Sequence, residues 1–265
     1  MHQCILFVPG DRPERFDRAA ASGADAIVID LEDAVQPETK SAARANIVAW
    51  LAAGGKAIVR INAIGTQWHE VDLKLLHSPN LLAVMLPKAE TPDSLAAFTT
   101  DLPDGLPVIA LIETALGMWN LGKLVQVKGI SRLGFGSIDF QLDTGIEDEG
   151  QGLLFARSQI VIASAMAGLE PPLDGVTVDL DSDAVLARDT ARARGFGFGG
   201  KLCIHPRQVI TIKSGFMPNA DEIEQARRIR TAAKETGAKG AIRLDGKLID
   251  APVVARAKRL LEGLE

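Results

Sequence analysis

The sequence is poor in cysteine, and it lacks both long apolar runs and blocks of like charge. Cys4 and Cys203 are the only two cysteines among 265 residues, which excludes a disulfide framework. No apolar run is long enough to form a transmembrane helix. The formal net charge is −5, which argues against binding to nucleic acid or to an anionic membrane surface.

The N-terminal stretch also lacks the pattern of a signal peptide. No basic region precedes its apolar residues, and Pro9-Gly10 interrupts it too early. We therefore expect a cytoplasmic protein that does not bind membranes. The length, with 47% hydrophobic and 24% charged residues, suits one large globular α/β domain or two small ones.

Short apolar runs alternate with helical patterns over most of the chain. The eight runs are Cys4–Val8, Ala24–Leu31, Lys56–Ile61, Leu81–Leu86, Leu106–Ile112, Ser131–Gly136, Leu173–Val178 and Gly200–Ile204. A helical pattern follows each run, and the one after the sixth run is Gly150–Gly168. Eight strand–helix units in unbroken alternation predict a closed TIM (β/α)8 barrel, with an open doubly wound sheet as the alternative.

A different pattern follows the eighth unit. Asp221–Glu235 is predicted to be an amphipathic helix, Asp245-Gly246 indicates a hairpin turn, and a last helix is predicted from Pro252 to Leu264. We therefore divide the chain into a barrel domain, residues 1–217, and a helix–hairpin–helix extension, residues 218–265. The apolar side of the extension must pack on the barrel or on a neighbouring subunit.

Polar residues gather where the predicted strands end. In chain order they are Asp30, Glu32, Asp33, Arg60, Lys88, Glu113, Asp139 and His205. In a barrel these positions meet at one mouth, where active sites lie. Glu113 and Asp139, after neighbouring strands, can bind one Mg²⁺ whose other ligands are waters and substrate oxygens. Arg60 can hold a substrate carboxylate, unless the mouth residues only pair with one another through salt bridges.

Three local patterns have simpler explanations than a catalytic one. Gly195-Phe-Gly-Phe-Gly-Gly200 matches a dinucleotide-binding pattern, but a helix precedes it and a strand follows, so we interpret it as a loop. Cys4 and Cys203 are expected to be two buried thiols rather than a disulfide. For Lys88 we favour a salt bridge or a phosphate contact over a Schiff base.

The opening of the chain, Leu6-Phe-Val-Pro-Gly-Asp-Arg-Pro-Glu-Arg-Phe16 followed by Gly23-Ala-Asp-Ala-Ile-Val-Ile-Asp-Leu-Glu-Asp33, resembles that of the citrate lyase β-subunit-like proteins of the HpcH/HpaI aldolase/citrate lyase family. The resemblance continues through Val59-Arg-Ile-Asn62, Leu86-Pro-Lys88, Leu111-Ile-Glu-Thr-Ala115, Gly136-Ser-Ile-Asp139, Phe155-Ala-Arg-Ser158, Asp174-Gly175, Cys203-Ile-His-Pro206 and Asp245-Gly-Lys-Leu-Ile-Asp250. It therefore covers nearly the whole chain.

The resemblance implies roles for particular residues. Glu113 and Asp139 would be ligands of Mg²⁺, and Arg60 would bind the substrate carboxylate. From their place at the end of the second predicted strand, Glu32 and Asp33 would orient metal-bound waters. Glu113, Pro9, Gly10 and Lys88 are also expected to contact substrate. In related malyl- and citramalyl-CoA lyases, an aspartate matched here by Asp250 reaches the site from a neighbouring subunit as an acid or base. That implies a homo-oligomer, and we expect a homotrimer.

The activity implied is that of a carbon–carbon lyase. It would cleave or form a 3-hydroxyacyl thioester such as a citryl- or malyl-thioester, with a 2-oxoacid such as oxaloacetate and an acetyl-thioester on the other side. The thioester carrier is coenzyme A or acyl carrier protein. Two alternatives stay open: a metal-dependent aldolase acting on pyruvate or oxaloacetate without a thioester, and a weakly catalytic 2-oxoacid-binding subunit of a larger complex.

Overall fold

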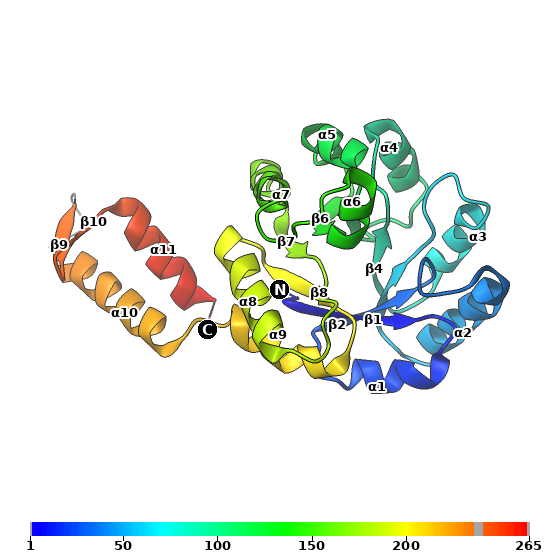
Figure 1. Ribbon diagram of the computed structural model, residues 1–265, viewed down its shortest axis with the longest axis horizontal. Coiled ribbons are helices and arrows are strands. Elements are labelled where there is room, and N and C mark those ends of the chain that lie inside the picture. The colour runs from blue at the N-terminus through cyan, green and yellow to red at the C-terminus, as the bar shows by residue number, and fades with distance from the viewer. Residues whose placement is uncertain (1, 236–240, 264–265) are drawn as a thin grey trace. The chain divides into compact units, whose positions relative to one another are not determined.

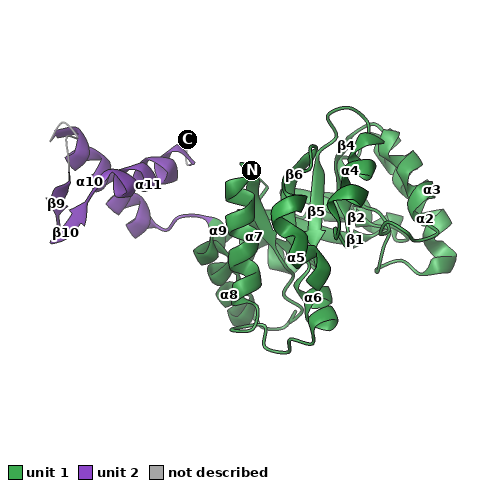
Figure 2. Ribbon diagram, turned by 90° about the horizontal axis from the view of Figure 1, so that it is seen from above, with its two compact units in different colours: residues 1–216 green, residues 217–265 purple. Residues whose placement is uncertain are grey.

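A computed structural model describes residues 2–235 and 241–263, and it divides the chain into two compact units, Met1–Phe216 and Met217–Glu265 (Figure 2). The last residue of the final predicted helix, Leu264, lies outside the described residues. No helix in these two ranges is both long and apolar enough to cross a membrane.

The first unit is a closed barrel of parallel strands, so the predicted TIM barrel is confirmed. The strands are β1 (Cys4–Pro9), β2 (Ala26–Asp30), β3 (Ala57–Arg60), β4 (Leu81–Leu86), β5 (Val108–Ile112), β6 (Ile130–Phe135), β7 (Glu170–Asp174) and β8 (Gly200–Cys203). Each pairs with the next in parallel, and β1 closes the ring against β8. The carboxyl ends of all eight strands therefore surround one mouth.

In residues 2–216, which the structure describes, nine α-helices surround the strands (Figure 1). They are α1 (Phe16–Ala20), α2 (Lys40–Ala52), α3 (His69–Leu73), α4 (Pro92–Thr100), α5 (Ala115–Leu124), α6 (Ser137–Thr144), α7 (Leu154–Met166), α8 (Asp183–Phe196) and α9 (Val209–Phe216). Single 3₁₀ turns lie at Pro13–Arg15, Pro37–Thr39, Lys74–His77 and Pro206–Gln208.

Two layers of apolar side chains form the core, because successive residues of a strand face opposite sides. One layer, which includes Ile5, Val28, Met85 and Leu111, fills the barrel interior. The larger layer lies between the strands and the helices. Cys4 and Cys203 belong to it as free thiols with their sulfurs 3.6 Å apart, as expected.

Three predictions differ from the structure by more than small shifts at the ends of elements. The seventh strand is Glu170–Asp174 rather than Leu173–Val178. The sequence placed this strand too late, because its first half contains Pro171 and Pro172, and proline usually argues against a strand. The predicted helix Gly150–Gly168 begins only at Leu154. A short helix, α6, precedes it, so Asp139 lies in the first turn of a helix rather than at the end of β6.

The second unit consists of α10 (Ala220–Glu235), a two-stranded antiparallel hairpin of β9 (Ile242–Leu244) and β10 (Lys247–Ile249), and α11 (Ala251–Glu262). Asp245 and Gly246 form the hairpin turn, both at positive φ. The unit has a small apolar core of its own, which includes Ile229, Ile249 and Leu261.

Candidate active site

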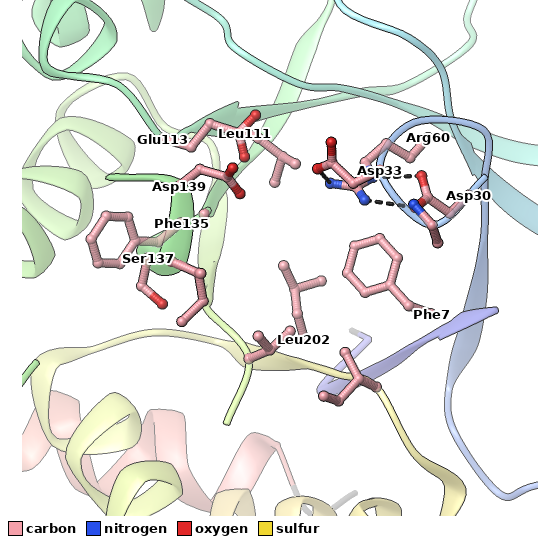
Figure 3. A pocket seen from close by; sticks show the side chains of 15 residues that line it. Phe7, Asp30, Asp33, Arg60, Leu111, Glu113, Phe135, Ser137, Asp139 and Leu202 are labelled. Carbon is pink, nitrogen blue, oxygen red and sulfur yellow. Dashed lines mark hydrogen bonds and ion pairs between the residues drawn. The ribbon is translucent and has the colours of Figure 1, made fainter. Parts of the chain in front are cut away.

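A cavity of about 340 Å³ opens at the mouth of the barrel. Figure 3 shows Glu113 and Asp139 on one side of it, and Arg60 with Asp30 and Asp33 on the other. Apolar side chains, among them Phe7 and Leu202, line the space between the two polar groups. The structure therefore brings together, at one cavity, residues that stand far apart in the sequence.

Arg60, the last residue of β3, is held by carboxylates on several sides. Its Nε and Nη2 donate to the two carboxylate oxygens of Asp30, each at 2.7 Å. Its Nη1 lies 3.0 Å from Oε2 of Glu32, and its guanidinium lies 4.9 Å from the centre of the Phe7 ring. Burial lowers the pKa of Arg60, but the charge and hydrogen bonds of Asp30 outweigh burial and raise it.

The engagement of Arg60 with Asp30 is a feature that sequence reasoning missed. The Nε and Nη2 edge of the guanidinium, which can bind a carboxylate through two parallel hydrogen bonds, is already used within the protein. Asp30 ends β2, which pairs directly with β3 so that Asp30 is in register with Arg60. The adjacency of the two strands in sequence was the available signal.

Glu113 follows β5 and is only 1% exposed. Its Oε1 accepts a hydrogen bond of 2.8 Å from the backbone N–H of Lys88. Burial, together with the charges of Glu32 and Asp139, raises the pKa of Glu113 to about 8, against the opposing effects of Arg60 and the Lys88 N–H. This carboxylate is therefore costly to ionise unless a cation is close to it.

Gly136 provides the space that Glu113 occupies. A Cβ atom at position 136 would lie 2.3 Å from Oε2 of Glu113, so no larger residue fits without displacing that side chain. Gly136 is also the N-cap residue of α6, which places Asp139 in the first helical turn, beside the cavity. The buried hydroxyl of Ser137, another cavity residue, has no hydrogen-bond partner in the described part of the chain.

Glu32 and Lys88 bridge the loops after β2 and β4. The Nζ of Lys88 lies 2.8 Å from Oε1 of Glu32, which is the salt bridge that we favoured for this lysine. Burial raises the pKa of Glu32 and the charge of Asp33 adds to this, while Arg60 and Lys88 oppose it. The second oxygen of Glu32 is buried and makes no hydrogen bond within the described residues.

The charges around the mouth leave an excess of negative charge. Four carboxylates, of Asp30, Asp33, Glu113 and Asp139, line the cavity, and among the described residues Arg60 is the cationic side chain that lines it with them. Glu32 and Lys88 pair with each other next to Arg60 and add no net charge. The described residues contain no cluster of three or more His, Cys, Asp or Glu side chains arranged for a metal. Glu113 and Asp139 form a two-carboxylate set, which suits Mg²⁺ because this ion keeps several waters.

The other predicted site residues lie elsewhere. Pro9 lines a neighbouring cavity of about 330 Å³, together with Arg15, Arg18 and His205. Gly10 contacts the backbone of Asp30, since its N–H donates to the Asp30 carbonyl at 2.9 Å and a Cβ would lie 2.8 Å from that oxygen. Asp250 belongs to the second unit, where it caps α11 by accepting from the Val253 N–H.

Sequence and structure comparisons define the class of protein. The HpcH/HpaI aldolase/citrate lyase family matches residues 3–206, and the chain belongs to this family. The citrate lyase subunit beta-like protein of Deinococcus radiodurans is 34% identical, with 97% of this chain and 95% of the relative covered. The citrate lyase subunit beta of Leuconostoc mesenteroides is 31% identical, with coverage of 99% and 93%.

A solved structure gives the same result. Protein CitE from Mycobacterium tuberculosis, in complex with magnesium, acetoacetate and coenzyme A, superposes with a TM-score of 0.87 at 31% identity. The match covers 98% of this chain and 97% of the other. The predicted family is thus confirmed, and the chain is a lyase of the citrate lyase β-subunit-like type.

Proposed function

We propose that the protein is a magnesium-dependent lyase that cleaves a 3-hydroxyacyl-CoA to a 2-oxoacid and acetyl-CoA. The observation that carries this proposal is the pairing of Glu113 and Asp139 across the cavity from Arg60 (Figure 3). Two carboxylates with excess negative charge suit a divalent cation, and an arginine opposite them suits a carboxylate substrate.

Glu113 and Asp139 would hold Mg²⁺. Bound there, the ion supplies Lewis-acid stabilisation for the hydroxyl oxygen that becomes a ketone oxygen as the carbon–carbon bond breaks. The raised pKa of Glu113 supports this assignment, because a cation removes the cost of ionising a buried carboxyl. Oε2 of Glu32, which pairs with Nη1 of Arg60 but makes no hydrogen bond within the described residues, would accept one from a water of the hydrated ion.

Arg60 would bind the carboxylate of the 2-oxoacid half. Because Asp30 uses Nε and one N–H of Nη2, the substrate would use the remaining N–H groups of Nη1 and Nη2. Asp30 thereby fixes the plane of the guanidinium before substrate arrives. Lys88 pairs with Glu32, the same carboxylate that Arg60 contacts, so a second positive charge lies close to Arg60.

The thioester half would extend into the neighbouring cavity that Pro9 lines. Phe7 and Ile204 line both cavities, so the two cavities adjoin at these residues. Arg15 and Arg18 give the neighbouring cavity a positive wall, which suits the phosphates of coenzyme A. Acyl carrier protein presents the same arm with one phosphate, and we favour coenzyme A because three phosphates match this wall better.

The reaction needs one proton to leave and one to arrive. The substrate hydroxyl loses its proton, the carbon–carbon bond breaks to give the 2-oxoacid, and the bond electrons form the enolate of the acetyl thioester. That enolate takes up a proton at carbon. We propose that Asp250 delivers it, from a neighbouring subunit of a homotrimer, as the resemblance implies.

A cytoplasmic location stays a prediction.

A substrate panel tests the proposal. Purified protein is incubated with citryl-, malyl- and citramalyl-CoA in the presence of Mg²⁺ or of EDTA, and the 2-oxoacid and acetyl-CoA are measured. We expect at least one of these thioesters to be cleaved, and its cleavage to require Mg²⁺. Turnover of free hydroxyacids alone would favour the thioester-independent aldolase. Binding of 2-oxoacid without any turnover would favour the weakly catalytic subunit.

A further inference from the structure

Lys40, the first residue of α2, lies behind the mouth and does not line the cavity. It is 4% exposed, and its Nζ donates to the carbonyl oxygens of Leu31, at 2.6 Å, and Glu32, at 2.8 Å. Both carbonyls belong to the turn after β2. A buried ammonium that donates to two backbone carbonyls fixes the course of that turn, because leaving those carbonyls without partners is costly.

The turn that Lys40 holds carries the Glu32 side chain. This carboxylate lies between the two cations of the mouth, 3.0 Å from Nη1 of Arg60 and 2.8 Å from Nζ of Lys88. Any shift of the Glu32 backbone would move the carboxylate away from both. Lys40 therefore acts on Arg60 and Lys88 through a residue that contacts them, without touching the cavity itself.

The same face of α2 also holds the segment after β3. The Nζ of Lys40 lies 4.9 Å from the centre of the Trp68 ring. One helical turn later, Arg44 pairs with Asp72, whose Oδ2 accepts hydrogen bonds from the backbone and side chain of Asn62. The turn after β2 and the segment after β3 are thus both held by side chains of α2.

We propose that Lys40 is a positioning residue for the oxoacid half of the substrate: it holds the turn after β2 so that Glu32 keeps Arg60 and Lys88 in place. The inference rests on the proposed function, since it assumes that a 2-oxoacid binds at Arg60. Burial lowers the pKa of Lys40, and the surrounding carboxylates of Asp30, Asp72, Glu32 and Asp33 oppose that effect.

A double-mutant cycle tests this role, with pyruvate as the probe in the presence of Mg²⁺. Calorimetric Kd values are measured for the wild type, Lys40→Met, Glu32→Gln and the double variant. We expect Lys40→Met to weaken pyruvate binding about 10-fold. In the Glu32→Gln background the same substitution should change the Kd by less than about twofold, because its effect passes through Glu32.

Two further variants separate positioning from general stability. Lys40→Arg keeps the charge and several donors, and we expect it to bind pyruvate more tightly than Lys40→Met. Lys213→Met is the matched control, because the Nζ of Lys213 donates to the Gly23 carbonyl and to Asp25 at the opposite end of β2. It should lower the Tm and leave the pyruvate Kd unchanged.

The outcomes distinguish the inference from the proposed function. A pyruvate Kd for Lys40→Met within about twofold of the wild type, with a lower Tm, would show a purely structural lysine. If Lys40→Met weakens pyruvate binding equally with and without the Glu32 carboxylate, the charge of Lys40 acts directly on the bound pyruvate. If Lys40→Met is insoluble, Lys40→Gln must show the same loss and the same dependence on Glu32. A wild type that binds pyruvate but cleaves no thioester would overturn only the proposed function, whereas one that binds neither pyruvate nor oxaloacetate and cleaves no thioester would overturn both.

Discussion

Glu113 is buried by the fold, although the proposed chemistry needs its carboxyl group to be ionised. It is 1% exposed and its pKa is raised to about 8, chiefly by burial and then by the neighbouring Glu32. Without metal, ionising this carboxyl destabilises the folded state. The site is thus built at a cost to stability that a bound cation would offset.

Glu113→Gln should therefore have opposite effects with and without metal. The folded pKa of Glu113 lies above its unfolded value of 4.5, so the stability of the metal-free wild type is lost as pH rises from about 4.5 through 8. Glutamine has no charge to form, so in EDTA the variant should become more stable than the wild type toward pH 8, by about 2 °C or more in Tm. In Mg²⁺ only the wild type should be stabilised.

The measurement is thermal unfolding of both proteins at pH 5 and pH 8, in EDTA and in Mg²⁺. A Tm difference between them that stays the same at both pH values would contradict the raised pKa. Equal stabilisation of both by Mg²⁺ would place the metal elsewhere.

Arg60→Lys is expected to weaken the oxoacid half of the reaction selectively. Lysine keeps the charge but has no planar fork, so it cannot bind Asp30 through two parallel hydrogen bonds and a substrate carboxylate as well. We expect the pyruvate Kd to rise about 10-fold or more, with a much smaller change in the Kd for acetyl-CoA. Equal losses for both halves would count against Arg60 as the carboxylate site.

At the scale of elements, α6 and the end of β5 meet at Gly136. Because a Cβ at this position would lie 2.3 Å from Oε2 of Glu113, Gly136→Ala should displace that carboxylate while the barrel stays folded. We expect Mg²⁺ affinity to fall about 10-fold or more. Gly122→Ala is the control, since Gly122 lies within α5 with nothing within 4 Å of a Cβ. The control should keep its Mg²⁺ affinity, and calorimetry on both variants decides the matter.

The sequence predicted elements well where one periodicity dominated. Eight apolar runs identified eight strands, and their alternation with helical patterns predicted the closed barrel. The prediction was wrong where the local signal was weak or misleading. Pro171 and Pro172 concealed the start of β7, and α6 has only eight residues, too few for a clear helical pattern.

The strand ends predicted part of the cavity lining but not the pairings within it. Strand ends alone brought Arg60, Glu113 and Asp139 to one mouth. Spacing in the sequence does not reveal the directions of side chains. It therefore could not predict that Asp30 binds Nε and Nη2 of Arg60, or that Lys40 donates to backbone carbonyls. Such contacts depend on the tertiary packing of strands, turns and helices around the mouth.

At the scale of the whole molecule, the second unit takes part in the proposed reaction only if Asp250 reaches a barrel mouth. Asp250 lines a cavity of about 540 Å³ in that unit, among apolar residues such as Ile249 and Val254. Complementation tests the proposal that the mouth belongs to a neighbouring subunit. Inactive Asp250→Asn and inactive Glu113→Gln proteins are mixed under conditions of subunit exchange, and thioester cleavage is measured.

We expect activity to return, because some mouths of a mixed homotrimer would combine an intact Glu113 with an intact Asp250. Exchange is verified with labelled subunits, and sedimentation gives the oligomeric state. No recovery despite proven exchange would mean that Asp250 acts within its own chain or takes no part in the reaction.

The central claim is that one divalent cation binds between Glu113 and Asp139, and diffraction from crystals grown with Mn²⁺ and pyruvate tests it most directly. Mn²⁺ substitutes for Mg²⁺ at oxygen ligands and has an anomalous signal that identifies it. The account predicts a single anomalous peak in the barrel mouth, at bonding distance from one carboxylate oxygen of each residue, with pyruvate on the Arg60 side. A peak at other side chains, or a mouth without any peak at saturating Mn²⁺, would contradict it.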